Sequence, residues 1–101
     1  MTIILTDNKI NNIAQIMLLI DTENRKQINK YGIQSYPIEK WALVASEESG
    51  EVCKAILDFI YYQNEGENSH DIESYLNDII NEAIQAATCY IKIASMILEG
   101  V

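Results

Sequence analysis

Residues 38–62 read IEKWALVASEESGEVCKAILDFIYY, and the spacing of their apolar side chains decides the fold. These side chains recur at intervals of three, four and seven residues, which is the repeat of one face of an α-helix. The pattern predicts a helix from about Ile38 to Tyr62 with a single buried stripe. The stripe consists of Trp41, Val44, Ala45, Val52, Ala55, Ile56 and Phe59.

Three carboxylates interrupt this apolar helix within five residues, at Glu47, Glu48 and Glu51. At about 100° per residue, Glu48 falls in the middle of the stripe, Glu51 lies one turn further on, and Glu47 flanks both. An unpaired buried carboxylate is costly, so such a group is normally protonated, paired with a cation or bound to a metal. We interpret the three acids as a metal-binding edge. The alternative is a solvated helix face.

The rest of the chain is also expected to be helical, because no segment alternates with a period of two. One proline and four glycines leave few turn signals. The first helix is expected to follow an N-cap at Thr6, Asp7 or Asn8 and to run to about Lys30. A loop at 31–37 then places Pro37 in the first turn of the second helix. After a second loop at 64–69, the last helix is expected to run from Ser69 or Asp71 to about Glu99 and to end at Gly100.

The last helix carries two apolar stripes side by side, so two of its faces favour burial. A three-helix monomer rarely covers that much of one helix. We therefore expect an all-α bundle of three main helices per chain that is completed by a homodimer or homotetramer. The first stripe is Leu76, Ile80, Ala83, Ala87, Tyr90 and Ala94, and the second is Ile79, Ala86, Cys89, Ile93 and Ile97.

Composition limits the classes of function. The 101 residues suit a single domain, 1–101, and 49% of them are hydrophobic, which allows a real core. No apolar run approaches the roughly 18 residues of a membrane span, and we expect a soluble, cytoplasmic protein without a membrane partner.

The net charge of −8 argues against binding to a nucleic acid polymer. Cys53 and Cys89 are expected to be reduced packing residues, and a zinc site is not expected.

Polar side chains on the last helix lie at helical spacing around Glu82. They are Asp78, Asn81 and Gln85. If this side of the helix faces the carboxylates of the second helix, the two together supply the oxygen ligands that Mg²⁺ or Mn²⁺ prefers. The alternative is a buried polar seam that sets the register of the bundle.

These motifs resemble the all-α nucleoside triphosphate pyrophosphatase superfamily, the MazG-like proteins. That family carries EExxE on one helix and ExxD on the next. Here Trp41 is followed by Glu47-Glu48-Ser49-Gly50-Glu51, and Glu82-Ala83-Ile84-Gln85 comes some thirty residues later. The stretch from Glu23 to Gln34 is similar to the region before EExxE in a small branch found in bacteria and phages. The resemblance covers about Glu23 to Leu98.

One position departs from the family pattern, because Gln85 stands where the last aspartate is expected. An amide oxygen can ligate Mg²⁺, but it brings no negative charge. Asp78, one turn earlier, is a candidate to restore that charge. The resemblance implies that Glu48, Glu51 and Glu82 are metal ligands, that Gln85 fills the fourth position, and that Glu47 positions or deprotonates a water molecule.

The reaction that the resemblance implies is hydrolysis of a nucleoside triphosphate to the monophosphate and pyrophosphate, with Mg²⁺ or Mn²⁺ as cofactor. Candidates for phosphate contacts are Lys54, Lys30, and Arg25 or Lys26. The alternative for each is an ordinary solvated charge. Trp41, Tyr31, Tyr36 and Tyr90 are candidates for stacking on a base, with core packing as the alternative.

Such an enzyme would serve nucleotide-pool housecleaning. Two other functions remain open. The first is a catalytically weak or inactive MazG-like protein that binds and sequesters a nucleotide or nucleotide signal, because Gln85 removes a charge from the metal site. The second is a helical adaptor without a metal. The sequence does not indicate which base or sugar is preferred.

Overall fold

The computed structural model describes residues 9–64 and 72–100, and within them the chain is all-α. Helix α1 spans Lys9–Tyr31, α2 spans Ile38–Asn64 and α3 spans Ile72–Leu98. The expected class, three helices without strands, is confirmed for these residues. The expected N-cap at residues 6–8 and the second loop with the start of the last helix, up to residue 71, lie outside the described residues. No described helix is long and apolar enough to cross a bilayer.

The ends of the helices follow the predicted signals. Gly32 has a φ of 73° and donates its N–H to the carbonyl of Ile28, so α1 ends in a left-handed glycine cap. The Pro37 carbonyl accepts hydrogen bonds from the N–H groups of Lys40 and Trp41, which places the proline at the start of α2 as expected. Gly100, with a φ of 88°, follows α3.

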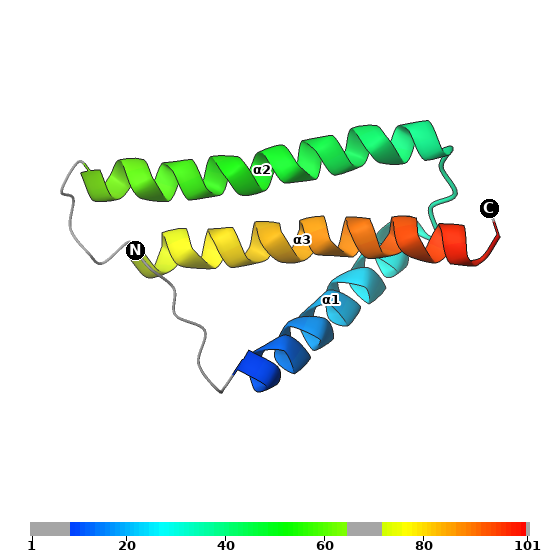
Figure 1. The fold of residues 1–101 in the computed structure, drawn as a ribbon, viewed down its shortest axis with the longest axis horizontal. Helices are drawn as coiled ribbons and strands as arrows, with labels where there is room; N and C mark the ends of the chain where they lie inside the picture. The colour runs from blue at the N-terminus through cyan, green and yellow to red at the C-terminus, as the bar shows by residue number, and fades with distance from the viewer. Residues whose placement is uncertain (1–8, 65–71, 101) are drawn as a thin grey trace.

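Helices α2 and α3 lie side by side and antiparallel, and α1 crosses α3 at an angle (Figure 1). Among the described residues, α1 packs on α3 and not on α2. The C-terminal half of α1 lies near the C-terminal half of α3, where Lys92 donates a hydrogen bond to Gln27 Oε1. Helix α3 is therefore the central element: α2 packs along it, and α1 crosses its C-terminal half.

The core is small and centres on Trp41, Ala45 and Cys89. The predicted stripe of α2 is largely confirmed, since Phe59 is also buried and Val44, Val52 and Ala55 are half-buried. Ile56 is the exception, because 39% of its surface is exposed. On α3 the buried positions are Ala86 and Cys89 of the second stripe and Thr88, which belongs to neither stripe. Ile80 and Tyr90 of the first stripe and Ile97 of the second are about half exposed. A single chain thus covers only part of the apolar surface of α3.

Candidate metal centre

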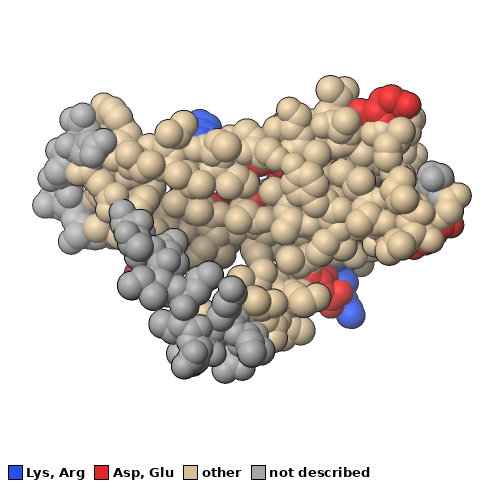
Figure 2. All heavy atoms as spheres, in the orientation of Figure 1, with Lys and Arg blue, Asp and Glu red and all other residues tan. Residues whose placement is uncertain are grey.

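Glu48 and Glu51 of α2 and Glu82 of α3 converge midway along the two antiparallel helices. One carboxylate oxygen from each can be chosen so that all three atoms lie within 4.8 Å of one another. Figure 2 shows acidic side chains recessed between α2 and α3. The i, i+3 spacing of Glu48 and Glu51 places both on the side of α2 that faces α3. The cluster could bind a metal ion.

Two oxygens of the cluster have no protein partner. Glu48 Oε2 and Glu82 Oε2 are both buried, and neither makes a hydrogen bond. Lone buried carboxylate oxygens are unfavourable unless a proton or a cation neutralises them. All three donors are hard oxygens, which suit Mg²⁺ or Mn²⁺ better than a softer ion. The residues present therefore fit a divalent cation of this kind.

The acidities of these groups reflect the same crowding. Burial raises the pKa of Glu48, and the neighbouring Glu51, Glu82, Glu47 and Glu23 carboxylates raise it further. Burial also raises the pKa of Glu82, and the interaction with Glu51 and then the charge of Asp78 raise the pKa of Glu82 further. Each shift means that negative charge is disfavoured at this point in the fold. A divalent cation would relieve that repulsion.

The other predicted ligands lie around the cluster. Asp78 lines a hollow with Glu51, Lys54 and Glu82, and no residue of α1 lines this hollow. Gln85, two turns further along the same face of α3, lines a different recess together with Glu48. Glu47, the candidate base, is exposed and does not belong to the converging set.

The predicted substrate-binding residues are divided between different surfaces. Trp41 and Lys30 line the same recess as Glu48. Lys54 is exposed beside the cluster and pairs with Asp58 at 3.0 Å. Arg25 pairs with Asp21 and lines an open surface of α1 with Lys26 and Lys30; unlike those two lysines, it does not line the recess.

The recess next to the cluster has a volume of about 340 Å³ and lies between α1, α2 and α3. Its aromatic wall contains Tyr36 and Trp41, whose ring centroids are 5.2 Å apart. Tyr31 also lines it, whereas Tyr90 is exposed and hydrogen-bonds Ser49 Oγ at 2.7 Å. Of the four aromatic candidates for stacking, three therefore lie at this recess.

Four polar residues of the recess were missed from the sequence: Glu23, Gln27, Gln34 and Lys92. Gln27 Nε2 donates to Glu23 Oε2 at 2.8 Å, and its Oε1 accepts from Lys92. Burial lowers the pKa of Lys92. The sequence signal for Lys92 was weak, because this residue lies one turn beyond Cys89 at the edge of the second apolar stripe and not within it.

Comparison with protein-family models, with curated proteins and with solved structures found no match. Over residues 9–64 and 72–100 the chain is an all-α protein of three helices with an acidic cluster between the second and third.

Proposed function

We propose that this protein is a Mg²⁺-dependent nucleoside triphosphate pyrophosphohydrolase of the MazG-like kind, acting on the cytoplasmic nucleotide pool. The observation that carries the proposal is the convergence of Glu48, Glu51 and Glu82, with ligand atoms within 4.8 Å of one another. The EExxE motif and the later Glu82 supply these residues from two helices. Their unpaired buried oxygens support a cation at this point.

The chemistry that Mg²⁺ supplies when bound is neutralisation of phosphate charge and acidification of a water molecule. In this proposal Glu48, Glu51 and Glu82 hold the metal, Gln85 and Asp78 lie on either side, and Glu47 accepts the proton of the attacking water. A protein with a net charge of −8 then binds a polyanion through the metal. Trp41 and its neighbouring tyrosines offer an apolar wall for a base next to the cluster.

The proposed protein works as a homodimer or homotetramer. Support comes from apolar side chains that a single chain leaves uncovered, including Met17 and Leu18 of α1, which are 63% and 68% exposed. Ile80 and Tyr90 of α3 are about half exposed as well. Exposed apolar side chains in such number favour association of chains, which would bury them.

A second candidate function is favoured by Gln85. An amide in the position where the family carries aspartate reduces the negative charge available to metal ions. The alternative is therefore a protein of the same class that binds and sequesters a nucleotide or nucleotide signal without hydrolysing it.

Incubation of the purified protein with Mg²⁺ and a panel of nucleoside triphosphates separates these possibilities. The enzyme releases pyrophosphate and the matching monophosphate, whereas the sequestering protein binds one equivalent of nucleotide and returns it intact. We expect Glu48→Gln to lower turnover at least about 100-fold, because it removes charge from a metal ligand. Glu39→Gln is the matched control, since Glu39 is an exposed acid in the first turn of α2.

The control variant should keep full turnover. Equal rates for the Glu48→Gln variant and the unmodified protein would remove Glu48 from the mechanism. If calorimetry detects no uptake of Mg²⁺ or Mn²⁺, with or without nucleotide, both functions are wrong and a helical adaptor is left.

A further inference from the structure

Basic side chains gather at the recess beside the acidic cluster. The chain has seven Lys and Arg residues, and three of them, Lys26, Lys30 and Lys92, line this one recess. In a protein with eight excess negative charges, this is an unusual concentration of positive charge. Two acids, Glu23 and Glu48, line it as well. The recess therefore combines a metal-ligating carboxylate with ammonium groups on the facing helices.

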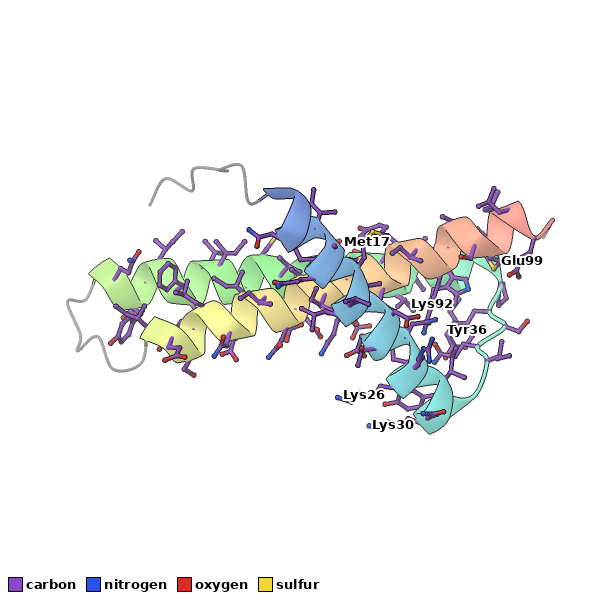
Figure 3. All side chains as sticks on the ribbon, turned by 90° about the horizontal axis from the view of Figure 1, so that it is seen from below. Met17, Lys26, Lys30, Tyr36, Lys92 and Glu99 are labelled. Carbon is purple, nitrogen blue, oxygen red and sulfur yellow. The ribbon has the colours of Figure 1, made fainter. Side chains whose placement is uncertain are left out.

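Lys92 differs from the other two lysines in its surroundings. Lys26 and Lys30 are exposed on α1, whereas Lys92 is half-buried and extends from α3 toward the C-terminal half of α1 (Figure 3). Its one hydrogen bond within the described residues goes to the neutral amide of Gln27. No carboxylate of the described residues lies within ion-pair distance of Lys92 Nζ.

The charge of Lys92 is only partly compensated: its hydrogen bond goes to a neutral amide, and the Glu23 carboxylate, which is bonded to the same amide, attracts it without forming an ion pair. Lysine is a compact point charge that suits phosphate oxygens, and a phosphate adds a charge–charge attraction that the neutral Gln27 amide cannot supply. An anion that enters the recess can therefore replace Gln27 as the partner of Lys92. Glu48 lines the same recess, so that anion lies next to the carboxylates proposed to hold the metal.

We propose that Lys92 is a phosphate-binding residue and that the recess between α1, α2 and α3 receives the polyphosphate chain of the nucleotide. This inference rests on the proposed function for the identity of the ligand. Lys92 contacts phosphate oxygens directly, and Gln27 holds the ammonium group in place when no phosphate is bound. Lys26 and Lys30 add positive charge at the entrance.

The test uses inorganic tripolyphosphate as the probe, because it carries the phosphate chain without a base. Titration calorimetry is performed on the full chain with Mg²⁺ alone, with tripolyphosphate and Mg²⁺, and with tripolyphosphate and a chelator. Lys92→Met should weaken tripolyphosphate binding about tenfold or more and should leave the uptake of Mg²⁺ alone unchanged. Lys40→Met removes the same charge from a lysine that lies over the Tyr36 ring, outside the recess, and should have little effect.

Gln27→Ala separates phosphate binding from a purely structural role of Lys92. If Lys92 only anchors α1 to α3, the two variants lose the same contact and should weaken tripolyphosphate binding equally. If Lys92 binds phosphate, Gln27→Ala frees the ammonium group and binding is kept or strengthened. Circular dichroism of all variants checks that they keep their helices.

The outcomes also separate this inference from the proposed function. Unchanged tripolyphosphate affinity in Lys92→Met, or equal losses in Lys92→Met and Gln27→Ala, would overturn the role of Lys92 even if Mg²⁺ binds. Conversely, Lys92-dependent binding of tripolyphosphate in the presence of chelator, without any uptake of Mg²⁺, would support the phosphate recess and reject the metal-dependent enzyme.

Discussion

Glu48 and Glu82 are the two residues whose ionisation the fold disfavours most plainly. Both have a buried oxygen without a hydrogen-bond partner, and burial is the main cause of the raised pKa of each. A carboxyl group whose pKa is raised on folding stabilises the protein below its unfolded pKa. That contribution is lost as the pH rises through the folded pKa. Through these two groups, the metal-free protein should therefore be more stable in mild acid, where both carboxyl groups are protonated, than at neutral pH, where both are ionised.

A glutamine at position 48 imitates the protonated carboxyl group at every pH. We expect the metal-free Glu48→Gln variant to melt at about the same temperature as the unmodified protein near pH 4 and about 2–5 °C higher near pH 7.5. Thermal melts of both proteins in chelator, at several pH values, measure this difference. A variant that is less stable than the unmodified protein at neutral pH would show that the Glu48 carboxylate is stabilised by a partner other than a metal.

Mg²⁺ should reverse the order of stability at neutral pH. A ligand that binds only the folded state at ten times its Kd stabilises it by about 1.4 kcal/mol, which corresponds to several degrees for a chain of this size. We expect that gain in the unmodified protein and expect it to be absent in Glu48→Gln. Equal gains in both proteins, measured by thermal melts with and without MgCl₂, would place the metal elsewhere.

At the scale of the helices, the sequence predicts the elements well and the site in part. The 3.6-residue repeat places α2 and the buried positions of Trp41, Ala45 and Phe59, because periodicity directly reports which face is covered. Convergence of Glu48, Glu51 and Glu82 also follows from the motifs. Lys92 and Gln27 were not predicted as partners, since their contact depends on the crossing of α1 over α3 and no local pattern encodes it.

Two glycines in helical surroundings give a matched test of these elements. Gly32 has a positive φ at the end of α1, while Gly50 lies inside α2 with open space around its Cα. Gly32→Ala should cost about 1–2 kcal/mol of unfolding free energy, because alanine is strained in the left-handed region. Gly50→Ala should gain about 0.5–1 kcal/mol from higher helix propensity.

Urea unfolding at a fixed protein concentration measures both changes. The opposite signs are the diagnostic feature, since any general sensitivity to an added methyl group would shift the two variants in the same direction. A loss of stability in Gly50→Ala would indicate that this part of α2 packs against a surface absent from the single chain.

At the scale of the whole molecule, the apolar surface of α1 is the feature that a single chain leaves uncovered. Ile13, Ile16, Met17, Leu18 and Leu19 are each between 45% and 68% exposed. The face of the molecule in Figure 2 also carries few charged side chains. Such exposure is unfavourable in water, and association of chains is the simplest way to cover it.

Sedimentation at micromolar concentration should therefore give two or four times the chain mass of 11.5 kDa. Leu18→Lys should shift the distribution toward smaller species, because a charge at a position that is 68% exposed in one chain would be buried between chains. Asn29→Lys adds the same charge to an exposed position in the other half of α1 and should not. A single-chain mass for the unmodified protein contradicts the proposed assembly.

Among the described residues, α1 is attached to α3 and not to α2. One of its tethers is the hydrogen bond from Lys92 to Gln27, which is the same bond that phosphate would displace. Occupancy of the recess and the orientation of the first helix are then thermodynamically linked, and linkage is reciprocal. If that helix forms the contact between chains, ligand affinity should vary with protein concentration, and the ligand should alter the strength of self-association by the same factor.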